Sequence, residues 1–456
     1  MAEQQAAGAA GTSSVRAWSV VLILLVLYLF GQVDRYVIGL LVQPISSHFG
    51  VGDFKMGLLM GPAFGLLYIA AAIPLGWAAD RTSRRGVMFA GVMLWAVAAC
   101  FCGLARTYNE LFIARMAVGI GEAALLPAAY SIVSQLFPRD RLAVALSVLS
   151  LGSVGGMGTA LLVGALIARL GAGSLAHLPL IGDLESWQLV FLITGAPVLL
   201  LGFLVFAIPD DRGAQAAGAA TAEPPLRVFP FLRQNARLMI GTFGGFSLMA
   251  LVTAAIASWA PTYMIRSFGW SITQTGFVLG LMTLLFSSVG KIGSGILVDW
   301  LFRIGRADAH VRFYAAVIAI TGPTALIAFL LPTAVPFVIL LAVYYMLAVP
   351  FMGFASAFIQ LVTPVALRGR ISALFLFAVN ASAMTVGPTL VGWMTEDVFG
   401  DKGALGWSIA AVVLVFAPPA LLLLLQALGP ARTLLGGDQA PEKTGARLSL
   451  KALKAS

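Results

Sequence analysis

The chain has 456 residues, of which 60% are hydrophobic and only 10% are charged. Soluble domains carry about 25% charged residues, so this composition excludes an ordinary soluble enzyme and indicates an all-α polytopic membrane protein. A helix needs about 20 apolar residues to cross a bilayer, and runs of that length recur along the sequence. The ~10-residue segments of alternating hydrophobicity that are typical of a transmembrane β-barrel do not occur in the sequence. The net charge of +9 does not indicate nucleic-acid binding, because the basic residues gather in alternate loops.

Twelve spanning helices are expected in chain order. Residues 1–16 are rich in Ala, Gly, Gln and Ser and predict a disordered N-terminus. No cleavable signal peptide is expected, because the first apolar run is too long and no small-residue cleavage site follows it. The approximate ranges of the helices are 17–46, 55–79, 86–105, 109–136, 141–169, 187–208, 237–265, 272–300, 313–331, 335–363, 370–394 and 404–428.

These helices fall into two halves. We expect an N-terminal six-helix bundle (17–208), a polar, Pro-containing linker (209–236), a C-terminal six-helix bundle (237–428) and a polar tail (429–456). Arginines crowd the linker and the loops after the second, fourth, eighth and tenth helices, whereas the opposite loops are acidic or neutral. The positive-inside rule therefore predicts that both termini and the linker are cytoplasmic, in a multi-pass protein of the cell inner (plasma) membrane.

The two halves also repeat one sequence pattern. Gly76-x-x-x-Asp80 follows the second helix, and Gly295-x-x-x-Asp299 follows the eighth. A parallel repeat of two six-helix bundles is typical of one secondary-transporter architecture. A channel would need a filter motif or a pore loop, and neither is evident.

Four charged residues interrupt apolar helices. Asp34-Arg35-Tyr36 lies within the first helix, and Arg115 and Glu122 lie within the fourth. Charge at bilayer depth costs roughly 2.5–3.5 kcal/mol per residue. Arg115 and Glu122 are seven positions apart, so they share one helix face. Since the four charges sum to zero, we expect a paired interior cluster.

Two functions fit this cluster. It could be a proton-coupled switch, in which a carboxylate (Asp34 or Glu122) takes up a proton and releases an arginine, or it could be a permanent structural ion-pair group. We prefer the switch. Asp34 and Arg35 lie about 100° apart on an ideal helix, so we expect them to face different partners. In this interpretation Asp34 titrates and Arg35 exchanges partners, while Arg115 holds an anionic group or neutralises Glu122.

Other polar residues give weaker indications. Asp80 with Arg81, Arg84 and Arg85 could form a cytoplasmic latch between the halves, or could only set topology. Lys291 in the eighth helix is interpreted as snorkelling to the interface in preference to facing a cavity. Asn380 is a candidate substrate contact, although such residues more often join helices. Tyr36, next to Arg35, is a candidate for substrate binding or gating. The cysteines and histidines show no metal-ligand spacing.

Several of these motifs resemble those of the major facilitator superfamily. The loop from Gly76 to Arg85 is similar to that family's signature between helices 2 and 3, and Arg115-x-x-x-Gly119-x-Gly121 is similar to its helix 4 motif. Within the superfamily, Asp34-Arg35-Tyr36 and the stretch VGIGEA (118–123) most resemble the Spinster branch. Branches that transport organic anions with protons carry similar residues. The Gly-Pro step of the antiporter motif is absent from the fifth helix.

The resemblance implies a secondary transporter that works by alternating access and uses no cofactor other than a proton gradient. It implies that Asp34, Arg35 and Glu122 serve coupling and gating, and that the substrate is amphipathic and lipid-like, such as a lysophospholipid or a sphingoid phosphate. A proton-coupled symporter of small organic anions such as sugar acids and an efflux pump for hydrophobic cations are the alternatives. An enzymatic role is not expected. We expect a monomer whose partners are its substrate, protons and the lipid bilayer, and the direction of transport stays open.

Overall fold

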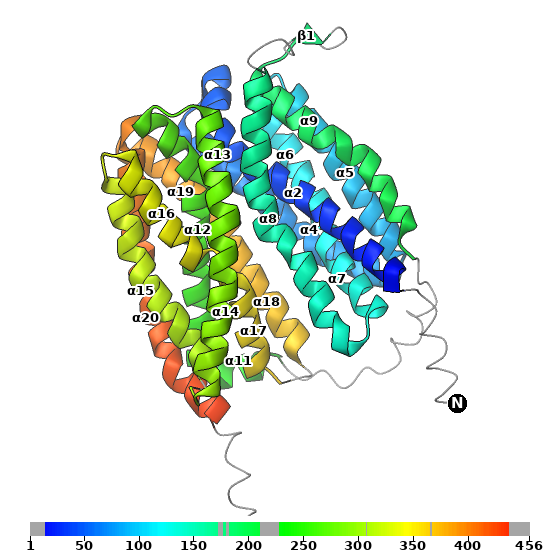
Figure 1. The fold of residues 1–456 in the computed structure, drawn as a ribbon, viewed down its shortest axis with the longest axis vertical. Coiled ribbons are helices and arrows are strands. Elements are labelled where there is room, and N and C mark those ends of the chain that lie inside the picture. Colours follow the sequence, from blue (N-terminus) through cyan, green and yellow to red (C-terminus); the bar gives the residue numbers. More distant parts are fainter. Residues whose placement is uncertain are drawn as a thin grey trace, which may run out of the picture.

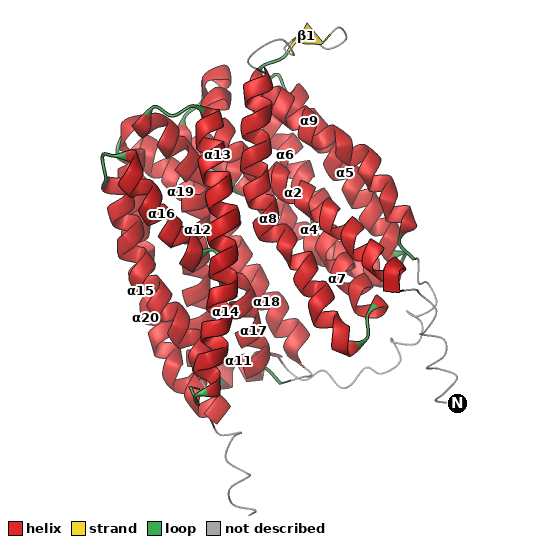
Figure 2. Cartoon of the chain, viewed as in Figure 1, coloured by secondary structure: helices red, strands yellow, loops and turns green. Residues whose placement is uncertain are grey.

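The computed structural model describes residues 14–171, 177–178, 182–209, 228–306, 308–364 and 367–436. Twelve helical stretches within these residues are long and apolar enough to cross a membrane. The prediction of an all-α bundle with twelve spans is therefore confirmed (Figure 2). Among the described residues, strands occur only as one antiparallel pair of two residues each, β1 (His177–Leu178) and β2 (Gly182–Asp183), between the fifth and sixth spans.

The N-terminal half supplies six spans. Its helices are α2 (Ser14–Phe49), α3 (Asp53–Met60), α4 (Pro62–Arg81), α5 (Arg84–Leu104), α6 (Tyr108–Glu122), α7 (Leu125–Leu136), α8 (Arg139–Gly171), α9 (Ser186–Leu201) and the 3₁₀ turn η1 (Gly202–Ala207).

The C-terminal half begins after α11 (Val228–Gln234) and also supplies six spans. Its elements are α12 (Ala236–Phe268), α13 (Ile272–Met282), η2 (Thr283–Ser287), α14 (Ser288–Arg303), α15 (Ala309–Leu330), α16 (Ala334–Ala348), α17 (Phe351–Val362), α18 (Arg368–Ala381), η4 (Ser382–Val386), α19 (Gly387–Trp393), η5 (Met394–Val398), η6 (Lys402–Ala404) and α20 (Leu405–Gly436). Of these, η2, η4 and η5 are single π-helical turns inside longer spans.

Local sequence explains where the helices begin and where they break. Ser83, Thr107 and Ser271 stand before α5, α6 and α13, and each hydroxyl accepts a hydrogen bond from a backbone N–H of the first turn. Proline lacks an N–H and its ring clashes with the carbonyl four residues earlier, so it interrupts a helix. The second span accordingly breaks at Pro62 and the tenth at Pro350.

Most boundaries differ from the sequence-based ranges by a few residues, and α2 already begins at Ser14, inside the segment 1–16 that was predicted to be disordered. Two differences are larger. The apolar segment VFPFLRQ forms α11, although it lies within the predicted linker. The last helix continues eight residues past 428, to Gly436, in spite of Gly429 and Pro430. Contacts with the fold explain this continuation: Arg432 donates to Asp308 at 2.7 Å, and Leu434 packs against the core. Tertiary contacts thus outweigh the local signal for a helix end.

The two halves lie side by side (Figure 1). We call the end at which α4 and α14 finish the linker end, and the end at which α2 and α12 finish the far end. Near the far end α8 packs along α13 and η2, and α3 packs on α19. Gly158 and Gly280 permit the first of these contacts, because a Cβ on either glycine would lie 2.9 Å from the other residue's carbonyl oxygen.

Hydrogen bonds also join the halves at the far end. Arg266 Nη1 and Nη2 in α12 donate to the Asp53 carboxylate of α3, at 2.6 and 2.8 Å, and Arg266 Nε donates to Gln43 Oε1 in α2 at 3.1 Å. Glu396 accepts from the backbone N–H of Phe54 at 2.7 Å. We call the group of Gln43, Asp53 and Arg266 the far-end clamp.

Candidate functional site

The fourth span breaks where its glutamate stands. The helix α6 ends at Glu122 and α7 begins at Leu125. Pro127 in the first turn of α7 cannot donate to the carbonyl of residue 123, so the regular helix is interrupted there. Glu122 therefore occupies the last position of α6, facing the middle of α2.

The four charged residues form two ion pairs between α2 and α6, Asp34–Arg115 and Arg35–Glu122, which we call the crossed pairs. Arg115 Nη1 donates to Asp34 Oδ2 at 2.8 Å and to the Asp34 carbonyl at 3.2 Å. Arg35 Nη2 donates to Glu122 Oε2 at 2.7 Å. Adjacent residues of α2 thus contact different partners on α6, as their angular separation predicts. Of the two roles that the sequence left for Arg115, neutralising Glu122 is not what the structure shows, because Arg115 bonds to Asp34.

Burial differs among the four side chains. Arg115 is fully buried, and Asp34 and Glu122 are almost so, whereas the side chain of Arg35 is 17% exposed. Buried charges require pairing, and losing one partner of such a pair is far more costly than losing a surface contact. Arg35 is therefore the member of the cluster that can be reached most readily from outside the protein core.

Aromatic rings line the same site. The Arg35 guanidinium lies 4.5 Å from the ring centroid of Phe64 and 5.0 Å from that of Tyr68, both on α4. The Arg115 guanidinium lies 5.5 Å from the Phe64 ring. Cation–π contacts favour a guanidinium over an aromatic face, particularly away from water. The site thus places charge directly against apolar surface.

The cluster has hydrogen-bonding capacity to spare. Within the four charged side chains and in Gln32, two residues before Asp34 on α2, six buried polar atoms have no hydrogen-bond partner among the described residues: Gln32 Oε1, Asp34 Oδ1, Arg35 Nε, Arg115 Nε, Arg115 Nη2 and Glu122 Oε1. Buried polar groups are normally satisfied, and exceptions concentrate at functional sites. The oxygens among these atoms can accept further hydrogen bonds, and the guanidinium N–H groups can donate them.

The remaining predicted residues are not members of the two ion pairs. Tyr36 is partly buried on α2, and Asn380 is partly buried on α18 of the other half, where it bonds to none of the four charged side chains. Arg81 stacks on Trp77 with 4.1 Å between guanidinium and ring centroid. Arg85 donates to the Ile208 carbonyl within its own half at 3.4 Å. The side chain of Asp80 lies outside the described residues, so the latch predicted for Asp80 with Arg81, Arg84 and Arg85 stays a prediction.

Sequence reasoning missed the far-end clamp. A signal was available, since Arg266 is one of the few arginines that the sequence places at the far end, together with Arg106 and Arg169. It departs from the charge pattern that the positive-inside rule describes. Its buried partner, Asp53, is only 1% exposed.

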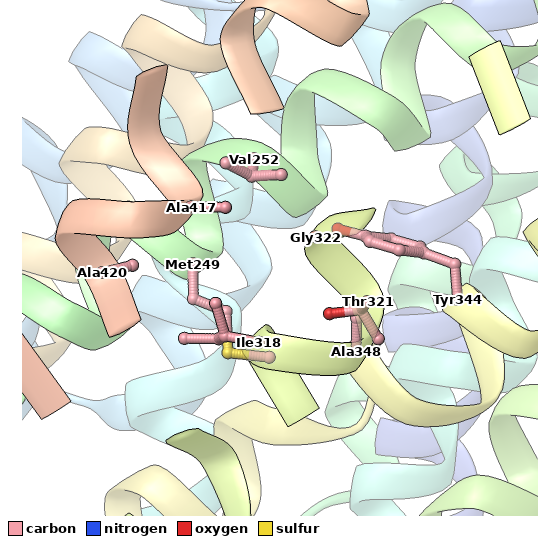
Figure 3. A pocket seen from close by; sticks show the side chains of 9 residues that line it. All are labelled: Met249, Val252, Ile318, Thr321, Gly322, Tyr344, Ala348, Ala417 and Ala420. Atoms are coloured by element: carbon pink, nitrogen blue, oxygen red, sulfur yellow. The ribbon is translucent and has the colours of Figure 1, made fainter. Parts of the chain in front are cut away.

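A small apolar hollow lies within the C-terminal half, apart from the charged cluster (Figure 3). Met249 and Val252 of α12, Ile318 and Thr321 of α15, and Tyr344 of α16 contribute to its wall, and its empty volume, including the open mouth, is ≈ 270 Å³. The Tyr344 hydroxyl lies 3.2 Å from the Thr253 hydroxyl. The hollow contains none of the predicted site residues.

Two six-helix halves with broken spans and a paired charge cluster at membrane depth define a polytopic membrane transporter. The chain belongs to the Major Facilitator Superfamily, whose model matches residues 24–388. As a member of that family it is a transporter and not an enzyme.

Individual relatives are more distant. The chain is 26% identical to an MFS-type efflux pump of Mycolicibacterium smegmatis, with 88% of this chain and 90% of that protein covered. It is 28% identical to the D-galactonate transporter of Escherichia coli, with 86% and 91% covered. It is 25% identical to protein spinster of Drosophila melanogaster, but only 63% of this chain and 46% of that protein are covered.

The fold is similar to that of a crystallised bacterial homologue of the human lysosomal transporter Spinster in an inward-facing, unoccupied conformation. The TM-score is 0.75 at 22% identity, covering 93% of this chain and 99% of that one. The predicted resemblance to the Spinster branch is therefore confirmed at the level of family and fold.

Proposed function

We propose that this protein is a proton-coupled transporter of an amphipathic, lipid-like substrate of the lysophospholipid or sphingoid phosphate class. The crossed pairs Asp34–Arg115 and Arg35–Glu122 carry this proposal. They place two carboxylates and two guanidinium groups at membrane depth. Charged groups there are energetically costly and usually mark a functional site. The aromatic rings against Arg35 provide an apolar wall next to a charged group, which suits an amphipathic substrate.

In the proposed mechanism Glu122 is the proton carrier nearest to the substrate path. Its partner Arg35 is the most exposed of the four charged side chains. A proton on Glu122 removes the charge that Arg35 neutralises, so the guanidinium becomes available to an anionic group of the substrate. Asp34 keeps Arg115 in place during this exchange and is the second titrating group.

We further propose that the linker end is cytoplasmic and that the protein lies in the inner (plasma) membrane. The excess of arginine at that end supports this orientation. Since the far-end clamp closes the opposite side, the conformation described above would be the inward-open one of an alternating-access cycle. Transport by a single chain is part of the proposal.

A sugar-acid symporter is the second candidate. It is favoured by similarity to the D-galactonate transporter over 86% of this chain. In that case Arg35, released from Glu122, would bind a carboxylate in place of a phosphate.

Transport by the purified protein in liposomes separates these candidates. A lysophospholipid, D-galactonate and a lipophilic cation would be offered in turn under an imposed pH gradient. We expect saturable movement of the lysophospholipid that depends on the gradient, and loss of that dependence in Glu122→Gln. Movement of D-galactonate alone would replace the lipid proposal with the sugar-acid one, and movement of the cation alone would indicate an efflux pump. Unchanged pH dependence in both Asp34→Asn and Glu122→Gln would refute proton coupling.

A further inference from the structure

A lysine lies at membrane depth in the C-terminal half. Lys291 on α14 stands 12 residues before Arg303, the last residue of its span, which is about 18 Å along a helix rising 1.5 Å per residue. The half-thickness of the hydrocarbon core is about 15 Å. A lysine at this depth in a membrane-spanning helix is a candidate functional residue.

The environment of Lys291 differs from that of the other deep cations. Its ammonium donates to the Ser150 hydroxyl of α8 at 3.2 Å. It therefore bonds across the two halves. The snorkelling interpretation expected no such bond. Among the described residues it has no carboxylate partner, whereas Arg35 and Arg115 each have one. A neutral hydroxyl leaves the lysine's charge uncompensated.

The position of this bond on the inter-half seam is also informative. Leu284 of η2, seven residues earlier in the chain, lies against Gly158 of α8, where the halves pack closely. Lys291 contacts α8 two turns nearer the linker end, beyond the stretch in which α8 packs along α13 and η2. The π-turn η2 immediately precedes α14, and such turns are frequent at functional sites.

We propose that Lys291 binds the anionic group of the substrate, a phosphate or a carboxylate, at the seam between the halves. This inference rests on the proposed transport of a substrate with an anionic group. The substrate oxygen displaces the Ser150 hydroxyl from the ammonium, so binding compensates the lysine's charge. The same displacement removes a hydrogen bond that joins the halves. Lys291 therefore selects the substrate by charge while Arg35 is still paired with Glu122, and Arg35 becomes available to the same anionic group only after Glu122 takes up a proton.

Matched probes test this inference by direct binding to the purified protein. Lysophosphatidic acid is compared with monoacylglycerol of the same acyl chain, and D-galactonate with galactitol, so that each pair differs in its anionic group. We expect the wild type to bind one anion at least about 10-fold more tightly than its neutral counterpart. Lys291→Gln should bring that preference close to one, and Lys291→Arg should retain it. Binding of the neutral probe and the melting temperature verify that each variant is folded.

Ser150→Ala is the control that separates charge from inter-half bonding. It removes the hydroxyl and keeps the ammonium, so we expect the preference for the anion to persist. Loss of the preference in Ser150→Ala to the same extent as in Lys291→Gln would overturn the inference, as would a preference that survives Lys291→Gln or is absent from the wild type. A preference seen only with D-galactonate would support the role of Lys291 and refute the lipid substrate, so the two proposals can fail separately.

Discussion

The far-end clamp should control which side of the transporter is open. Arg266→Gln leaves the Asp53 carboxylate, which is 1% exposed, without its bidentate partner in the conformation described here. Truncating one member of a buried, hydrogen-bonded charge pair costs about 2–5 kcal/mol. When the far ends separate, water reaches Asp53 and most of that cost disappears. Even 2 kcal/mol changes the ratio of the two conformations by about 30-fold.

Distances between spin labels at the far end measure this shift. Lys55 of the N-terminal half and Lys402 of the C-terminal half are both exposed there, and each can be replaced by a labelled cysteine in a chain without Cys100 and Cys102. We expect Arg266→Gln to move the distance distribution toward longer values. Combining it with Asp53→Asn should reverse part of the shift, because no buried charge is then left unpaired.

Arg432→Gln is the matched control for this experiment. It also breaks an arginine–aspartate pair, with Asp308 at 2.7 Å, but both residues belong to the C-terminal half. It should leave the distance distribution unchanged. If Arg266→Gln behaves in the same way as Arg432→Gln, the far-end clamp does not hold the two halves together.

Three further changes follow from the same structure. Gly158→Ala places a Cβ 2.9 Å from the Gly280 carbonyl oxygen, so the far-end label distances should lengthen; unchanged distances would mean that α8 and α13 can move apart at no cost. Arg115→Gln strands the buried Asp34 carboxylate and should lower the free energy of unfolding by about 3–5 kcal/mol, measured by denaturation in detergent, with partial recovery on adding Asp34→Asn. Burial of Asp308 would by itself raise the pKa of its carboxyl, but hydrogen bonds from Arg312 and Arg432 outweigh that effect and lower the pKa. The stabilisation is therefore present above the carboxyl's unfolded pKa and is lost as pH falls through the folded one; Asp308→Asn should lower the melting temperature at neutral pH and have less effect in acid, and an equal effect at both would contradict this origin.

Much of the fold was accessible from sequence because a bilayer permits few solutions. Apolar runs of spanning length and the charge pattern of the loops were enough to predict twelve helices in two halves. Helix ends were less accessible, since contacts such as Arg432 to Asp308 carry the last helix past a Gly-Pro signal. No local pattern describes such a contact between distant segments.

The candidate site was predictable in composition but not in pairing. Deep charges at Asp34, Arg35, Arg115 and Glu122 are visible as interruptions of apolar runs, and their zero net charge indicates pairing. Which carboxylate binds which arginine depends on the rotation of α2 against α6, and no local sequence pattern gives that rotation. The hydrogen bonds of Arg266 and Lys291 depend on how the two halves pack against each other. No short sequence segment contains that information.

Proton movement that accompanies substrate movement tests the central proposal most directly. Liposomes containing the purified protein and a trapped pH-sensitive dye would receive a lysophospholipid gradient with no pH gradient imposed. We expect the wild type to change the internal pH as substrate moves, and Glu122→Gln to exchange substrate without any pH change. Substrate-driven proton movement that is the same in Glu122→Gln and the wild type would contradict the role of the Arg35–Glu122 pair in coupling.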